Sequence, residues 1–334
     1  MATQPAYVAH CLDEGVSLRH IVVQGSDWFA CGTRVKPGGE HQPIFLQSGF
    51  VNELPLPVNY YGGGVRSILP TFQGVGTCWQ RTSPQNPNEM RCAVWDDVRK
   101  ADPPRIITIP GVARGQLLFR IDDRILGMTR TTTGTEEVFV TDPGGRQVQF
   151  IGHLGGNMSQ GGALTKFGEV GGSSRLADGR LHPVRWHQTG GLKDLLPAAQ
   201  YGLVFGGNDL SELVGVTNFV PDINHGVLFD SRDQPTDLPP LSLAGHMYSL
   251  AYSLNCSAQI VGQSHKRHDQ GHDPRAVIWL DHKPLDLNGC IASWATNSPV
   301  PLNSASWITE EGVILCSSDK LNRRSRSVVL LPKI

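Results

Sequence analysis

The sequence carries almost no net charge and contains no long apolar run. Its 334 residues have a formal net charge of −1, whereas a nucleic-acid-binding surface normally needs a basic excess. No apolar run reaches the roughly 18 residues that a membrane-spanning helix requires. The first 18 residues lack the basic segment and apolar stretch of a signal peptide. We therefore expect no nucleic-acid partner and no membrane partner.

Paired cysteine motifs are also missing. The seven cysteines are scattered, and no Cys-x-x-Cys pair occurs. We interpret them as reduced thiols of a cytoplasmic protein and expect no cysteine zinc site. The chain also lacks a Gly-x-Ser-x-Gly elbow, a phosphate-binding loop and a dinucleotide-binding glycine motif. These absences argue against the common hydrolase, nucleotidase and dehydrogenase classes, and we expect no cofactor.

What the sequence does contain is a repeat. The segment 254–287 predicts a strand, a turn, a second strand, a loop and a β-hairpin. The same order recurs along the chain, and the last residue of each third strand is spaced 43 to 51 residues from the next. A period of about 40–50 residues with four strands per unit is typical of a β-propeller blade. The anchor residues are Leu46, Trp95, Val140, Trp186, Phe229, Trp279 and Leu330.

The repeat predicts an all-β fold, a seven-bladed β-propeller of four-stranded antiparallel blades forming one domain over residues 1–334. Residues 6–12 are expected to supply the fourth strand of the C-terminal blade and so close the ring. An open array would leave a strand edge unpaired. The blades are predicted near 15–57, 61–110, 113–152, 158–197, 200–240, 245–288 and 301–334.

The units resemble the HAF repeat. "AVIW…LDL" and "LNCSAQIVG" match its pattern best, "PVRW…KDLL", "GVLF…TDL" and "NDLSELVG" match well, and the first, third and seventh units match in outline. The resemblance implies the propeller fold and little about function. Members are often described as extracellular, in contrast to the cytoplasmic location expected here.

Residues that recur at one position of the repeat are expected to be structural. Trp95, Trp186 and Trp279 should pack between blades, and the turn glycines should serve the backbone. Cys31 and Cys316 are assigned to the same position as those glycines, as small buried fillers. The acids of the Asp-Leu pairs, Asp194, Asp237 and Asp286, are interpreted as turn residues of the fourth strands.

Function is expected where the repeat is broken, in the loops from each fourth strand to the next first strand. Although only 7% of the chain is aromatic, these loops carry Tyr60, Tyr61, Tyr201, Tyr248 and Trp294, which we predict to bind substrate at the mouth of the channel. Ordinary surface packing of these rings is the alternative.

Three residues are predicted to be catalytic. His246 and His153 would move a proton, and Arg66 would stabilise developing negative charge. Arg66 follows three glycines, residues 62–64, which we interpret as opening space near the mouth. A structural salt bridge or a contact with channel water is the alternative for Arg66.

The segment 265–273 is the densest ionisable cluster. Its His265, His268 and His272 could ligate a metal ion. Because Lys266 and Arg267 in the same segment would repel a cation, we expect no metal site. The segment is either a solvated loop or a loop over the pocket, in which case His268 would contact substrate.

Two functions remain open. The first is a small-molecule-binding propeller acting as a cofactor-independent cyclase, lyase or isomerase on a partly apolar or aromatic substrate. The second is a non-enzymatic protein-interaction scaffold. The sequence does not fix the oligomeric state, and we expect a monomer.

Overall fold

The computed structural model describes residues 5–80, 89–112, 114–130, 134–220, 223–267, 273–295, 299–318 and 326–333. These residues form β-strands and one short 3-10 helix, η2 (Leu287–Cys290), with no α-helix among them. Within the same residues, no helix has the length and apolar character needed to span a membrane. The chain divides into a mid-chain unit, Ser17–Asp194, and a terminal unit, Met1–Val16 with Leu195–Ile334. That both belong to one domain stays a prediction.

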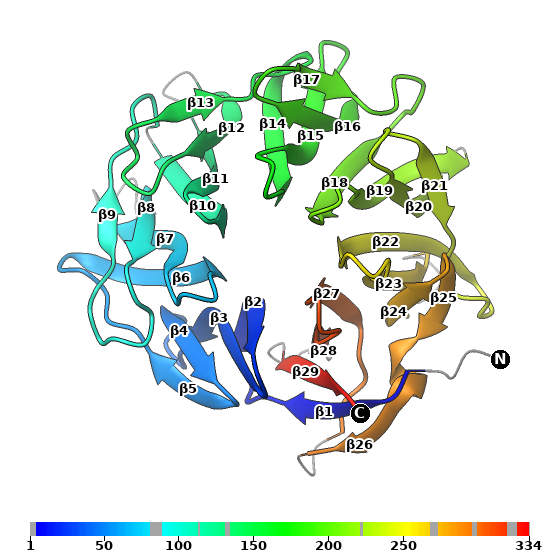
Figure 1. Ribbon diagram of the computed structural model, residues 1–334, viewed down its shortest axis with the longest axis horizontal. Coiled ribbons are helices and arrows are strands. Elements are labelled where there is room, and N and C mark those ends of the chain that lie inside the picture. The colour runs from blue at the N-terminus through cyan, green and yellow to red at the C-terminus, as the bar shows by residue number, and fades with distance from the viewer. Residues whose placement is uncertain are drawn as a thin grey trace. The chain divides into compact units, whose positions relative to one another are not determined.

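The mid-chain unit contains four groups of four consecutive strands (Figure 1). From β3 onward, neighbouring strands within each group run antiparallel, and a single parallel bridge between Glu136 and Met158 joins the last two groups. The strands are β2 (Val16–Gln24), β3 (Asp27–Val35), β4 (His41–Gln47), β5 (Phe50–Glu53), β6 (Tyr60–Ile68), β7 (Gly74–Gln80), β8 (Glu89–Trp95), β9 (Arg105–Ile107), β10 (Arg114–Ile121), β11 (Arg124–Arg130), β12 (Glu136–Thr141), β13 (Val148–Phe150), β14 (Gly155–Leu164), β15 (Val170–Leu176), β16 (Leu181–His187) and β17 (Gly191–Asp194).

The terminal unit contains two four-stranded antiparallel sheets and one sheet of five strands. The four-stranded sheets are β18 (Gly202–Gly207), β19 (Leu213–Val220), β20 (Ile223–Phe229) and β21 (Pro235–Leu238), then β22 (His246–Leu254), β23 (Ile260–Lys266), β24 (Arg275–Leu280) and β25 (Lys283–Asp286). The five-stranded sheet has the order β26 (Ile291–Trp294), β1 (Tyr7–Cys11), β29 (Arg326–Pro332), β28 (Ile314–Ser318) and β27 (Ser304–Ile308).

Strand β1 joins the two ends of the chain in one sheet. It pairs antiparallel with β29 over its whole length, and Figure 1 shows the blue β1 beside the red β29. This is the partner predicted for residues 6–12. On its other edge β1 pairs in parallel with β26, a strand that the sequence analysis missed because it placed Trp294 in a loop.

A β-bulge recurs at one place on the first strand of the groups. On each second strand, one position of the repeat is usually glycine, and it pairs with a residue of the first strand. In six groups the next residue of the first strand has no partner, and pairing resumes one residue later. A bulge leaves the extra residue unpaired and re-aims its side chain. We call this residue the bulge position; it is held by Arg66, Leu118, Gly162, Phe205, Tyr252 and Ser306.

The repeat glycine and the bulge are in close contact with each other. A Cβ atom on the glycine would lie closer than 3.0 Å to a carbonyl oxygen of the first strand at Gly32, Gly76, Gly172, Gly215 and Gly262. Glycine is therefore needed to let the bulged strand come close. In the first group this contact belongs to Gly32 and Ser17, so the assignment of Cys31 to the glycine position is wrong by one residue. In the other groups the bulge residue comes two positions after the residue whose carbonyl meets the glycine. The same offset from Ser17 assigns Arg19 to the bulge position of β2.

The repeat tryptophans lie in the core as predicted. Trp95, Trp186 and Trp279 are each at most 5% exposed, and the Trp279 indole N–H donates to the Pro239 carbonyl at 2.9 Å. Trp279 packs with residues of β19, β20 and β22, so it joins two neighbouring sheets of the terminal unit.

The acids of the Asp-Leu pairs are more than turn residues. Each contacts a cationic or imidazole side chain of the third strand in its own sheet, two residues along that strand from its directly opposed valine. Two are hydrogen-bonded to histidines, Asp194 to His182 at 2.8 Å and Asp237 to His225 at 2.9 Å. The third, Asp286, lies 4.0 Å from Arg275. The sequence analysis missed these pairs because the partners are about a dozen residues apart and lie outside the repeat pattern.

Removing β1 should destabilise the protein strongly. Deletion of residues 1–11 takes away Tyr7 and Ala9, both nearly fully buried in the core of the five-stranded sheet, and exposes the edge of β29. We expect a loss of at least about 3 kcal/mol in the free energy of unfolding, measured by urea denaturation. A synthetic peptide of residues 5–12, added to the truncated chain, should restore part of that stability. A truncated chain that unfolds like the full chain would contradict this role of β1.

Candidate functional site

The most unusual polar group of the terminal unit is His246, the first residue of β22. Its side chain has no exposed surface, and its Nδ1 lies 2.9 Å from the Ser264 hydroxyl on β23. That hydroxyl oxygen also accepts the Leu241 backbone N–H at 3.1 Å. Because the serine hydrogen is then free to point at Nδ1, the arrangement favours the histidine tautomer with its proton on Nε2.

The protonated edge of His246 faces Asp273. The His246 Nε2 lies 3.9 Å from a carboxylate oxygen of Asp273 and has no hydrogen-bond partner among the described residues. Burial lowers the pKa of His246, and the nearby Asp273 charge opposes that shift only in part. The imidazole is therefore neutral at pH 7, with its N–H group directed toward a carboxylate.

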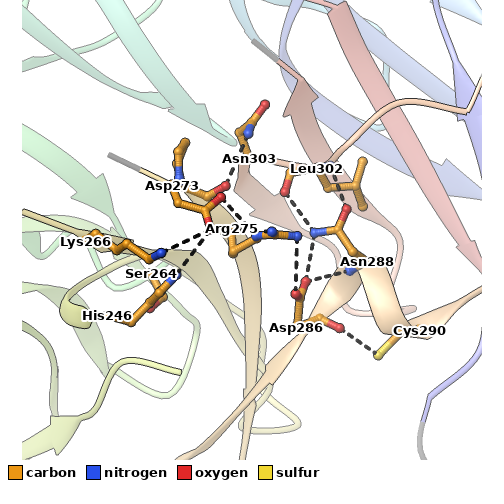
Figure 2. A network of polar contacts seen from close by, with 11 residues as sticks. His246, Ser264, Lys266, Asp273, Arg275, Asp286, Asn288, Cys290, Leu302 and Asn303 are labelled. Carbon is orange, nitrogen blue, oxygen red and sulfur yellow. Dashed lines mark hydrogen bonds and ion pairs between the residues drawn. The ribbon is translucent and has the colours of Figure 1, made fainter. Parts of the chain in front are cut away.

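Asp273 itself is accessible. Its side chain is 39% exposed, and two cations hold it from other directions, Arg275 at 3.3 Å and Lys266 at 4.0 Å. Figure 2 shows these groups converging from β22, β23 and the start of β24. A reachable carboxylate thus lies between a buried imidazole and two positive charges.

The network continues toward β27 and fixes the site. Asp286 accepts the backbone and side-chain N–H groups of Asn288, whose side chain in turn exchanges two hydrogen bonds with the Leu302 backbone. The Asn303 side chain donates to the Pro274 carbonyl at 3.2 Å, beside Asp273. These bonds join β24, η2 and the segment before β27, so Asp273 is supported from both sides (Figure 2).

The predicted residues of the terminal unit do not all gather around this network. Tyr248 stacks on His265, with ring centroids 5.2 Å apart, two residues along β22 from His246. Tyr201 precedes β18, and burial raises its pKa. Trp294 lies on β26, at the opposite edge of its sheet from β27, and packs against the core. The structure therefore corrects its predicted place in a loop at the channel mouth. His268 lies outside the described residues.

The other predicted residues lie in the mid-chain unit. Tyr60 packs against a hydrophobic core of that unit. The next residue, Tyr61, is half-buried. The His153 Nε2 lies 3.3 Å from a carboxylate oxygen of Glu137. Arg66 contacts Gln116. That these side chains meet those of the terminal unit in one site stays a prediction.

The interpretation of glycines 62–64 is wrong. A Cβ atom would lie 2.6 Å from the Trp79 ring at Gly62 and 2.8 Å from the Thr77 carbonyl at Gly63, and it would overlap the Thr33 hydroxyl at Gly64. These glycines permit close packing and do not open space.

A cavity of about 420 Å³ lies at the other end of the terminal unit's strands. The turns between β22 and β23, β24 and β25, and β27 and β28 form its wall, with the start of β1 and the end of β29. Such turns lie opposite the loops where the sequence analysis placed the site, so the cavity was not predicted. Its charged lining residues are Asp281, Glu310, Glu311 and Lys333.

Sequence reasoning also missed the groups that support His246. Ser264 and Asp273 are ordinary polar residues in the sequence, and only strand pairing brings them to the histidine. A second omission is the ring pair Phe205 and Tyr252, whose centroids are 5.3 Å apart and which both hold the bulge position. The recurring register shift is the signal that identifies them. Among the described residues, no group of three histidine, cysteine or acidic side chains could hold a metal ion.

The buried His246 should make stability depend on pH. Because its folded-state pKa is lowered, the unfolded chain binds a proton below about pH 6.5 that the folded chain does not. The free energy of unfolding should therefore fall as the pH drops below about 6.5. His246→Asn keeps an acceptor for Ser264 and removes the titrating group, so its unfolding free energy should fall less between pH 7 and pH 5 in urea titrations. Equal slopes in the two proteins would contradict this assignment.

Comparisons with known proteins identify the fold. No family model and no curated protein matches the sequence, so the HAF-repeat resemblance stays a prediction. Solved structures do match, each at low identity. A Mycobacterium tuberculosis puromycin-hydrolyzing peptidase matches with a TM-score of 0.61 and 13% identity over 95% of this chain and 51% of that chain. The β-propeller domain of the Trilobed protease from Pyrococcus furiosus matches with a TM-score of 0.57 and 9% identity over 94% of this chain and 96% of that chain.

A polysaccharide lyase, an ulvan lyase, matches with a TM-score of 0.52 and 7% identity over 97% of this chain and 95% of that chain. The present chain spans about half the length of the puromycin-hydrolyzing peptidase. Identities this low show the fold alone. The predicted all-β architecture is confirmed, with many four-stranded antiparallel sheets, and the fold is that of a β-propeller; the sheet that contains β1 differs from the prediction in having a fifth, parallel strand.

Proposed function

We propose that this protein is a small-molecule-binding β-propeller that acts as a cofactor-independent enzyme of the lyase, cyclase or isomerase type. The observation that carries the proposal is the buried His246 Nε2, unpartnered by hydrogen bonds among the described residues and 3.9 Å from the accessible Asp273. Buried polar groups are normally hydrogen-bonded, and an exception at a solvent-facing carboxylate is a feature of functional sites.

In this proposal Asp273 is the group that exchanges a proton with the substrate. Its carboxylate takes a proton from a substrate carbon or hydroxyl, and the electron pair left behind moves to form a double bond or a new ring bond. Return of the proton to a different atom completes an isomerisation, and departure of a leaving group completes an elimination. His246 would act as a positioning residue, because its buried Nε2 can reach substrate only through Asp273.

The neighbouring cations would stabilise the intermediate. Arg275 and Lys266 lie on the two sides of Asp273 and supply positive potential where negative charge develops on the substrate. Ser264 is not a suitable nucleophile, since it is fully buried and its hydroxyl is already engaged with His246 and Leu241. This arrangement favours proton transfer over acyl transfer. Phe205 and Tyr252 offer ring surface in the same unit for a partly apolar substrate.

We also propose that the sheets form one closed ring of seven blades. The pairing of β1 with β29 supports this, because it places both ends of the chain in one sheet and leaves neither as a free edge. The period of the sequence repeat supports the same count. A monomeric, cytoplasmic protein remains our expectation.

The test begins with a thermal-shift screen of aromatic, polycyclic and acidic small molecules, followed by mass spectrometry to detect conversion of each compound that binds. Asp273→Asn should reduce turnover at least about a hundredfold, as loss of a general base does, while changing the melting temperature little. The matched control is Asp102→Asn, at an exposed position of the mid-chain unit. It should leave turnover unchanged.

Other outcomes separate the parts of the proposal. Normal turnover by Asp273→Asn would overturn the assigned site. Binding without conversion by the wild-type chain would overturn the enzyme and leave a binding protein. If no compound binds, the protein-interaction scaffold becomes the better hypothesis.

A further inference from the structure

Two neighbouring first strands of the mid-chain unit carry arginine at the bulge position. Arg66 holds it on β6, and the contact of Gly32 with Ser17 assigns it to Arg19 on β2. The other mid-chain strands have Leu118 and Gly162 there, which carry no charge. The repeat fold therefore does not require a cation at this position.

The surroundings of Arg66 contain a hydrogen-bond acceptor but no counter-charge. Its side chain is half-buried, and its Nη2 lies 3.4 Å from the Gln116 side-chain oxygen on β10. In the part of the chain that the structure describes, no carboxylate forms an ion pair with Arg66 or Arg19. Six other arginines of the same unit do have such a carboxylate partner: Arg34, Arg91, Arg99, Arg105, Arg180 and Arg185.

Burial and a like charge both disfavour the charged form of Arg66. Burial, and to a lesser extent the charge of the neighbouring Arg19, lower its pKa to about 10. A guanidinium remains charged at pH 7 even so, and a half-buried guanidinium beside a second positive charge, without an acid, is electrostatically unfavourable. An anion between the two arginines would remove this cost.

We propose that Arg19, Arg66 and Gln116 form a binding site for an oxyanion group of a small molecule. The planar guanidinium fork of Arg66 binds two oxygens of a carboxylate, sulfate or phosphate group, and the Gln116 side-chain oxygen orients the fork. Arg19 is exposed and contributes charge from the solvent side. The site uses no residue of the His246–Asp273 network, so it stands independently of the proposed enzyme.

Isothermal titration at constant ionic strength, set with sodium chloride, tests the proposal. The probes are citrate, inorganic sulfate and inorganic phosphate, which distinguish a carboxylate from the two tetrahedral anions. At least one should bind with a stoichiometry of one. Arg66→Gln should weaken that binding at least tenfold, and Arg66→Lys should weaken it less. Arg180→Gln, which removes an arginine paired with Asp178, should bind like the wild type.

A second measurement excludes a purely structural arginine. Without oxyanion, Arg66→Gln should melt at the same temperature as the wild type or slightly higher, because a like-charge repulsion has been removed. With oxyanion, only the wild type should gain stability. Unchanged anion binding by Arg66→Gln, no binding of any probe at millimolar concentration, or a large loss of melting temperature in anion-free buffer would each overturn the proposal. None of these results bears on turnover by Asp273.

Discussion

The close approach of a bulged first strand to the second strand is the constraint on which this fold depends. At five glycines the approach leaves no space for a Cβ atom beside a carbonyl oxygen, so glycine is needed wherever the bulged strand comes this close. The extra residue of each bulge is removed from the pairing pattern and is free to vary. The repeat thus combines a fixed backbone with one variable side chain per group, and it is this side chain that carries differences in chemistry.

A second set of contacts, between polar side chains, fixes the ends of the strands. Asp194 with His182 and Asp237 with His225 bind the fourth strand to the third in two different units of the chain. A third copy, Asp286 with Arg275, is extended through Asn288 to the segment before β27. The same Arg275 lies 3.3 Å from Asp273, so the candidate site shares a residue with this recurring contact between the third and fourth strands.

The sequence predicted the architecture well because the fold is periodic. Turn glycines, third-strand tryptophans and the spacing between them determine the strands, and residues 6–12 could be assigned a partner because the last unit lacked a strand. The site was harder to predict for a physical reason. His246 is conspicuous in the sequence, but Ser264 and Asp273 reach it only through strand pairing, and the register shift that exposes Arg66, Phe205 and Tyr252 cannot be read from residue types. Trp294 was misplaced because a short parallel strand has no sequence signal of its own.

The variable side chains at the bulge position differ in kind between the two units. In the terminal unit they include the ring pair of Phe205 and Tyr252, and burial raises the pKa of Tyr252 to about 12, so that its hydroxyl stays neutral and donates to Gln263. In the mid-chain unit they include two arginines. Aromatic rings favour an apolar ligand surface, whereas guanidinium groups favour an anion. The same backbone position therefore carries different chemistry in the two units, although the backbone arrangement around it is the same.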